Sequence, residues 1–322
     1  MADKPKVAIC WFGGCGGCDE AVVDINEEIL AVADAVDFTL WPIALDFKYD
    51  HVKALKDGEI TLSIINGSVR SSEHEELAHL LRKKSQLVLS FGACACFGGT
   101  PGLANLRGKE DILQWVYKDA PTVVNPQGNV PQVKAKVNGY NLTLPEMYNQ
   151  VFPLHTIIDV DYFLPGCPPP PNLVAEAINT IVVGPLPPKG STLAPNRALC
   201  ETCVRNRTKP VKLAITEFKR ISEIEADPEK CFLAQGVLCM GPATRSGCGE
   251  VCMGINLPCR GCFGPVEGVA DMGAKYLSAV AALVDAENEG KAEQIIDQLL
   301  DPAGYFYRFT TASSILQKKR GA

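Results

Sequence analysis

Cysteine is the residue type in this 322-residue chain with the greatest capacity for chemistry, and the chain contains 14 cysteines. Thiolates bind soft metal ions and iron–sulfur clusters, whereas in an oxidising compartment the same residues form disulfides. Several of the cysteines occur as Cys-x-x-Cys pairs. Two thiolates at this spacing can bind one metal centre, so the pattern indicates metal or redox chemistry.

The N-terminal half has three cysteine motifs, and each directly follows an expected strand. A glycine-rich Cys-x-x-Cys contains Cys15 and Cys18, Gly-Ala-Cys-Ala-Cys-Phe-Gly-Gly contains Cys94, and Pro-Gly-Cys-Pro-Pro-Pro contains Cys167. The first motif alone is also typical of a thioredoxin-like pair or a zinc knuckle. Because the carboxyl ends of parallel strands face one crevice, we expect the four thiolates to converge there, which suits a 4Fe-4S cluster.

The C-terminal half contains a second and denser set of cysteines. These are Cys200, Cys203, Cys231, Cys239, Cys248, Cys252, Cys259 and Cys262. Eight thiolates are enough for two four-iron clusters or for two zinc ions. The run typical of two-cluster ferredoxins is absent, and zinc ribbons remain open from the spacing alone.

Two cysteines are left over. Cys10 lies within an apolar strand and is expected to be a small buried side chain. Cys96 is two residues from Cys94 and, on spacing alone, either of the two could be the ligand.

Alternating strands and helices are expected to position the first set of thiolates. Strands are predicted at 7–11, 38–45, 60–65, 87–91 and 155–164, and helices at 19–33, after a capping box at 72–75, and at 172–183. This alternation predicts an α/β fold with a flavodoxin-like, doubly wound parallel sheet. Residues 104–150 fit the pattern poorly and are interpreted as an insertion.

A change of composition separates the two halves. The segment from Gly184 to Ser191 contains three prolines and two glycines and is interpreted as a linker. We therefore predict domains at 1–184 and 185–322, the second smaller, irregular and organised around metal, with a helix at 271–284.

Bulk composition excludes several classes of function. Hydrophobic residues make up 47% and charged residues 21% of the chain, which is typical of a globular protein. The net charge of −6 argues against a nucleic-acid partner. The chain has neither a signal-peptide core nor an apolar run near the ~18 residues of a membrane span, so it is expected to be cytoplasmic and not membrane-bound. In the reducing cytoplasm, disulfides are disfavoured.

Taken together, the cysteine motifs resemble a known family. Cys-x-x-Cys after the first strand, Gly-x-Cys-Ala-x-x-Gly-Gly after a later strand and Gly-Cys-Pro-Pro are similar to the proximal-cluster signature of nickel–iron hydrogenase small subunits. The resemblance continues through the second cysteine set and so covers most of the chain. It selects Cys94 over Cys96, and it assigns Cys15, Cys18, Cys94 and Cys167 to a proximal 4Fe-4S cluster.

The resemblance also implies a medial and a distal 4Fe-4S cluster. It assigns the distal cluster to Cys200, Cys203, Cys231 and Cys239, and the medial cluster to Cys248, Cys252, Cys259 and Cys262. The chain departs from the common members of the family at two positions, since Cys200 stands where they have histidine and Cys252 where they have proline. Both departures add a thiolate, and the second implies a four-iron instead of a three-iron medial cluster.

Within the family, the chain most resembles the cytoplasmic methanogen enzymes that reduce viologen but not deazaflavin and feed heterodisulfide reductase. The implied function is that of an oxidoreductase subunit without a hydrogen-activating site of its own. It would carry electrons from a nickel–iron large subunit to a low-potential acceptor, either the heterodisulfide reductase system or ferredoxin/viologen. The implied further partners are a small iron–sulfur adaptor subunit and the heterodisulfide reductase complex. The alternatives are a deazaflavin- or NAD(P)-reducing hydrogenase subunit, a complex I-like cluster subunit, and a non-enzymatic zinc scaffold.

Overall fold

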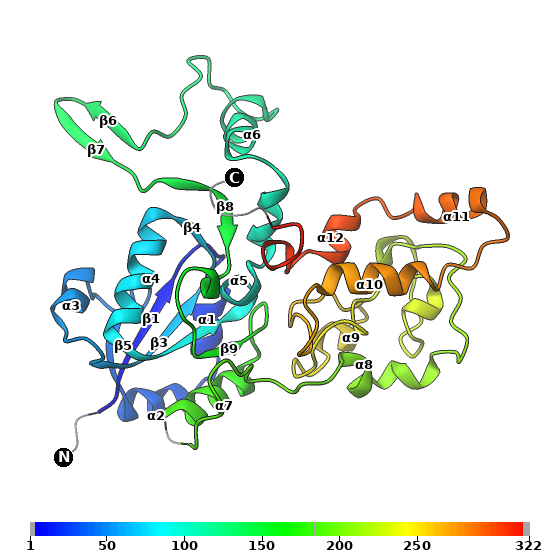
Figure 1. The fold of residues 1–322 in the computed structure, drawn as a ribbon, viewed down its shortest axis with the longest axis horizontal. Coiled ribbons are helices and arrows are strands. Elements are labelled where there is room, and N and C mark those ends of the chain that lie inside the picture. The colour runs from blue at the N-terminus through cyan, green and yellow to red at the C-terminus, as the bar shows by residue number, and fades with distance from the viewer. Residues whose placement is uncertain (1–3, 183, 318–322) are drawn as a thin grey trace.

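The chain forms two lobes that lie side by side (Figure 1). The computed structural model describes residues 4–182 and 184–317. The first lobe, residues 4–182, contains a central sheet with helices around it. The second lobe, residues 196–310, consists mainly of loops and short helices. Among the described residues, none of the helices is both long and apolar enough to cross a membrane.

The first lobe is built on a five-stranded parallel sheet. Its strands are β1 (Lys6–Trp11), β2 (Asp37–Leu40), β3 (Ile60–Asn66), β5 (Ser85–Phe91) and β9 (Tyr162–Leu164). Their spatial order is β2-β1-β3-β5-β9, and every neighbouring pair is parallel. This is the flavodoxin-like order, in which the strand order reverses between β1 and β3. The predicted α/β fold class is confirmed.

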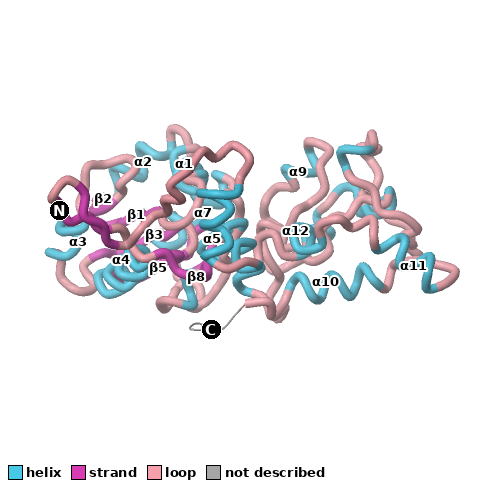
Figure 2. The backbone as a smooth tube through the Cα atoms, turned by 90° about the horizontal axis from the view of Figure 1, so that it is seen from above, coloured by secondary structure: helices cyan, strands magenta, loops and turns pink. Residues whose placement is uncertain are grey.

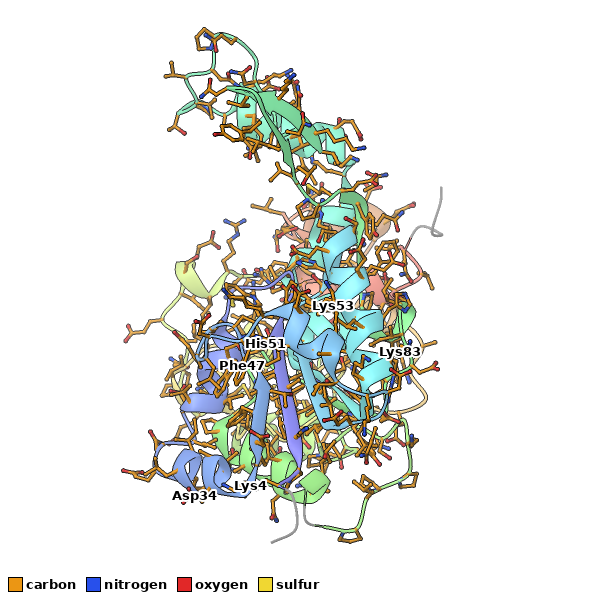
Figure 3. All side chains as sticks on the ribbon, turned by 90° about the vertical axis from the view of Figure 1, so that its left-hand side faces the viewer. Lys4, Asp34, Phe47, His51, Lys53 and Lys83 are labelled. Carbon is orange, nitrogen blue, oxygen red and sulfur yellow. The ribbon has the colours of Figure 1, made fainter. Side chains whose placement is uncertain are left out.

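Helices cover both faces of this sheet (Figure 2). One face carries α1 (Gly17–Val23), α2 (Glu28–Ala35) and α7 (Pro171–Val182), and the other carries α3 (Tyr49–Ala54), α4 (Ser72–Lys84) and α5 (Gly92–Phe97). Successive strand residues point to opposite faces, so Val7 and Ile9 join the first core while Ala8 and Cys10 join the second. In Figure 3, His51 and Lys53 mark α3 in front of the sheet.

Several predicted boundaries are wrong, for local reasons. The single helix expected at 19–33 is two helices, because Asn26 adopts φ 56° between them, and Leu30 is 68% exposed. The strand expected at 38–45 ends at Leu40. The N-cap of α4 is Ser71, whose hydroxyl accepts a hydrogen bond from the His74 amide, one residue before the predicted capping box.

The segment interpreted as an insertion has structure of its own. It contains α6 (Lys109–Gln114) and a hairpin of β6 (Lys134–Val137) and β7 (Tyr140–Thr143), which projects from the lobe (Figures 1 and 3). Next, β8 (Met147–Phe152) pairs antiparallel with β4 (Val69–Ser71). Long-range pairing of this kind cannot be detected in a local sequence pattern.

The last strand of the sheet is shorter than predicted, and the linker follows its edge. A 3₁₀ turn occupies Leu154–Thr156, so the strand expected at 155–164 is only β9. The Phe163 amide donates to the Ser191 carbonyl at 3.1 Å, and the Leu193 amide donates to the Phe163 carbonyl at 2.7 Å. The proline-rich segment therefore extends the sheet edge before it enters the second lobe.

The second lobe has an apolar core despite its irregular backbone. Its helices are α8 (Leu199–Thr202), α9 (Val251–Gly254), α10 (Met272–Ala281), α11 (Glu289–Ile296) and α12 (Pro302–Phe306). Across the two lobes, further short helical turns cover Thr100–Leu106, Trp115–Asp119, Val204–Thr208, Ile221–Glu223, Leu233–Gln235 and Thr311–Ser313. The helix expected at 271–284 is α10, capped by the Asp271 carboxylate. Phe232, Tyr276 and Phe306 are buried in the core of the second lobe.

Close packing joins the two lobes. Phe263 is 1% exposed and packs into the core of the first lobe, and Phe97 lies against Gly264 so closely that a Cβ at Gly264 would be 2.3 Å from its ring. Near the C-terminus, Ala312 packs in the same way against Gly98 and Gly102. The segment that contains Cys262 is therefore held against the first lobe.

Candidate iron–sulfur cluster sites

The four cysteines predicted for the proximal site come from three strand ends. Cys15 lies in the loop after β1, Cys18 in the first turn of α1, Cys94 in α5 after β5, and Cys167 after β9. The pKa of the Cys18 thiol is raised above its ordinary value by burial first, and then by thiolate repulsion from Cys94, Cys167 and Cys15 in that order. Burial and the thiolates of Cys167 and Cys15 also raise the pKa of Cys94 to about 12. The structure therefore brings these four sulfurs together.

Two glycines make room for these sulfurs. At Gly92, with φ +82°, a Cβ would lie 2.3 Å from Cys18 Sγ, and at Gly99, with φ +59°, it would lie 2.5 Å from Cys94 Sγ. Any side chain at either position would displace a thiol and would also be strained by the positive φ. This explains the glycines that flank Cys94 in the motif.

A buried carboxylate lies next to the first motif. Asp19 is 3% exposed and accepts hydrogen bonds from Trp41 Nε1 at 3.0 Å and from Asn66 Nδ2 at 2.8 Å. These bonds tie the first turn of α1, and with it Cys18, to β3 and to the segment after β2. The signal available in the sequence was only the position of an acidic residue directly after a cysteine.

The two spare cysteines point away from the proximal site. Cys96 is 1% exposed, and its thiol donates to the Ser90 carbonyl at 3.3 Å within β5. Burial raises its pKa to about 12. Cys10 is 2% exposed in the core on the α3 and α4 side of the sheet, and burial raises its pKa to about 12 as well.

A cavity in the second lobe contains the four cysteines predicted for the distal site. Its lining includes Cys200, Cys203, Cys231 and Cys239. Burial, and then the thiolate of Cys239, raise the pKa of Cys200 to about 12. Gly241 leaves the space free, because a Cβ there would lie 3.2 Å from Cys200 Sγ.

The cysteines predicted for the medial site lie between the other two groups. Cys248 and Cys262 pack against the core of the first lobe, and Cys248 packs against that of the second lobe as well. The pKa of Cys262 is raised to about 12 by burial and then by the thiolates of Cys248, Cys167 and Cys252. Burial, followed by the Cys239 thiolate, raises the pKa of Cys259 well above its ordinary value.

The three groups adjoin in series. The thiol of Cys262, in the medial group, lies close enough to Cys167 of the proximal group for the Cys167 thiolate to raise its pKa. The amide of Cys259, also in the medial group, donates to Cys239 Sγ of the distal group at 3.3 Å. The medial group is thus in contact with both of its neighbours.

The donor set fits iron–sulfur clusters chemically. Thiolates in close proximity at buried positions repel one another and lack water, which is the cause of the raised pKa values; cationic iron removes that penalty and displaces the protons. Within 4–182 and 184–317, no three His, Cys, Asp or Glu side chains lie close enough to hold a single metal ion.

Comparison with known proteins identifies the family. Residues 15–181 match the family described as "NADH ubiquinone oxidoreductase, 20 Kd subunit". The iron–sulfur subunit of the F420-non-reducing hydrogenase of Archaeoglobus profundus is 37% identical over 98% of both chains. The corresponding F420-non-reducing hydrogenase chain of Methanothermobacter thermautotrophicus is 37% identical over 99% of this chain and 98% of its own.

Solved structures agree on the fold. A chain of the Dm. baculatum [NiFeSe]-hydrogenase structure superimposes with a TM-score of 0.51 at 16% identity, covering 83% of this chain and 96% of that one. The fold and the three cysteine groups define an iron–sulfur electron-transfer protein of the NiFe hydrogenase small-subunit class.

Within that class the chain belongs to the family of the iron–sulfur small subunits of F420-non-reducing hydrogenases. It is an electron-transfer subunit of an oxidoreductase, and a large subunit is its partner. The resemblance inferred from the cysteine motifs is confirmed. The NADH ubiquinone oxidoreductase family, which corresponds to the complex I-like alternative, matches residues 15–181, whereas the hydrogenase relatives match both lobes.

Proposed function

We propose that this chain conducts electrons through three 4Fe-4S clusters, from the nickel–iron centre of the large subunit to a low-potential acceptor other than F420. The proximal cluster would be held by Cys15, Cys18, Cys94 and Cys167, the medial by Cys248, Cys252, Cys259 and Cys262, and the distal by Cys200, Cys203, Cys231 and Cys239. When bound, each cluster takes up and releases one electron.

The observation that carries this proposal is that the medial cysteines adjoin both other groups. The amide of Cys259 donates to Cys239 Sγ at 3.3 Å, and Cys262 lies close enough to Cys167 to interact with its thiolate. Electron tunnelling falls steeply with distance, and this order requires the medial cluster to be the bridge.

The protein contributes positioning and exclusion of water. Amide donors such as that of Cys259 stabilise negative charge on sulfur, and Gly92 and Gly99 let the backbone approach the proximal site. Packing of Cys239 and Cys262 against the apolar cores keeps the clusters away from bulk solvent, which disfavours the more negative reduced state.

The exposed end of the proximal site supports docking of the large subunit there. Cys15 and Cys167 are exposed, and Trp11, which covers the glycine loop beside Cys15, is 43% exposed. A partner that covers this edge would bury all three in a wide interface. At the opposite end, a small iron–sulfur adaptor subunit and the heterodisulfide reductase complex are the proposed acceptors. We further propose domains at 1–184 and 185–322 and a cytoplasmic location, where reducing conditions preserve free thiols.

Iron and acid-labile sulfide analysis of the anaerobically purified protein tests the cluster assignment. Twelve ligands in three sets predict about 12 irons and 12 sulfides per chain and a brown colour. Mainly zinc, or iron near four per chain, would contradict it.

A second experiment tests the division of labour. The chain purified without a nickel subunit is expected to lack hydrogen uptake, because the cluster ligands are all assigned to electron transfer. Full uptake by nickel-free protein would refute the assignment.

A further inference from the structure

A buried arginine lies beside the distal group of cysteines. Arg205 is 3% exposed in the 3₁₀ turn Val204–Thr208, two residues after Cys203. Together with the four distal cysteines it lines the distal cavity. Its position in the sequence alone does not distinguish it from the other arginines of the chain.

The guanidinium of Arg205 is bonded only to uncharged groups. Nη1 donates to the carbonyls of Asp227 at 3.2 Å and Lys230 at 3.4 Å, and Nη2 donates to the Met253 carbonyl at 3.2 Å and to Asn256 Oδ1 at 2.9 Å. The same group lies 4.3 Å from the centroid of the Phe232 ring. Lys230 precedes Cys231 and Met253 follows Cys252, so Arg205 connects a distal ligand loop with a medial one.

No carboxylate within the described residues lies at ion-pair distance from Arg205. The other arginine at 3% exposure differs, since Arg245 has Glu267 at 4.0 Å. A buried charge without a counter-charge is strongly unfavourable, so a charge of opposite sign is expected close by.

An iron–sulfur cluster with four thiolate ligands supplies that charge, because it is negative and becomes more so on reduction. Cys200 adds a thiolate where common members of the family have a neutral histidine, which increases the negative charge of the distal site. A cation at Arg205 offsets this addition.

We propose that Arg205 is the counter-charge of the distal cluster and raises its reduction potential, so that the distal cluster stays reducible by the medial one despite the extra thiolate at Cys200. This inference rests on the proposed function. Through its bonds beside Cys231 and Cys252, Arg205 also holds the distal and medial ligand loops at a fixed separation.

An EPR-monitored redox titration of the complete hydrogenase complex tests this role. Arg205→Gln removes the charge and is expected to lower the reduced-to-oxidised ratio of the distal cluster about tenfold at the wild-type midpoint, which equals about 59 mV for one electron. Arg205→Lys retains the charge and is expected to stay within about threefold of wild type. Equal shifts in both variants, or no shift with glutamine, would overturn the proposal.

Arg82→Gln is the matched control. Arg82 also donates to backbone carbonyls, those of Ser85 and Gln86, but it is paired with Asp161 and lies on α4, in the lobe without distal ligands. Its distal potential should equal that of wild type, and an equal shift in Arg82→Gln would contradict a local charge effect.

Iron content separates the possible failures. If Arg205→Gln loses its distal cluster, Arg205→Lys tests the charge role. A lysine variant with full iron and a wild-type distal potential supports that role, and a lysine variant that also loses iron contradicts it. Wild-type protein without a distal four-iron signal would instead refute the proposed function.

Discussion

The two lobes bring cysteines together in opposite ways. In the first lobe, none of the four proximal cysteines is a buried member of either apolar core. These cysteines follow the ends of strands instead. In the second lobe, Cys259 is part of the core itself, and Cys203, Cys231 and Cys239 pack against it. The fold positions the thiols in the first lobe, whereas we expect the proposed clusters to fix the loops in the second.

The helices that contain the predicted cluster cysteines differ in length between the lobes. In the first lobe α1 spans seven residues and α5 six, while α8 and α9 in the second lobe span four residues each, although α10 there spans ten. Helices of four residues cannot be stable alone, because nucleation costs more than one turn returns. We therefore expect ligation by the proposed clusters to stabilise these two short helices.

Removal of the clusters should therefore destabilise the second lobe much more than the first, and this is the largest expected effect. After anaerobic chelation, amides in residues 196–310 should lose at least about a hundredfold in hydrogen-exchange protection, while those of β1, β3 and β5 stay protected. Mass spectrometry of exchanged peptides measures both. Equal loss of protection in the two lobes would contradict the comparison.

Asp161→Asn should do the reverse and weaken only the first lobe. Burial alone would raise the pKa of Asp161, but hydrogen bonds from Lys189, Arg82 and the Val88 amide outweigh it and hold the pKa below its ordinary value. We expect a loss of about 3 kcal/mol in the free energy of unfolding at pH 7, seen in denaturant titration of the sheet.

The pH dependence gives the control for this variant. Because the pKa of Asp161 is lowered in the folded state, its contribution is present above the ordinary value of 3.8 and is lost as pH falls through the folded value. Wild type and Asp161→Asn should therefore converge in stability as pH falls below 3.8 and through the folded value. A constant difference across the acidic range would show that the ionised carboxylate is not the cause.

Cys252→Pro should alter the second lobe without unfolding it. Cys252 is the second residue of α9, in the first turn, where proline is tolerated. Loss of one thiolate is expected to leave a medial three-iron cluster, with a new paramagnetic signal in the oxidised protein and a raised medial potential. An unchanged EPR spectrum with full iron content would show that Cys252 is not a ligand.

The smallest effects are expected at the two spare cysteines. Cys96→Ser and Cys10→Ser should retain all iron and lose about 1–2 kcal/mol in the free energy of unfolding, because each places a hydroxyl in an apolar core. Cys94→Ser is the matched contrast and should lose the proximal cluster. Iron loss in Cys96→Ser but not in Cys94→Ser would reverse the choice between these neighbours.

Strong local patterns allowed much of the fold to be predicted. The runs that became β1, β3 and β5 are rich in β-branched and apolar residues and are followed closely by glycine, so their type and position were evident. Boundaries failed where one residue decides the backbone, as at Asn26, and where pairing is remote, as between β4 and β8.

The sequence by itself determined which chemistry is available, because the type and spacing of the cysteines restrict what they can bind. Only the tertiary structure decided how the groups adjoin. The contact of Cys259 with Cys239 joins residues 20 positions apart, and the bond from Arg205 to Met253 joins residues 48 positions apart. Such contacts depend on how loops pack around a shared core, and no local pattern encodes that packing.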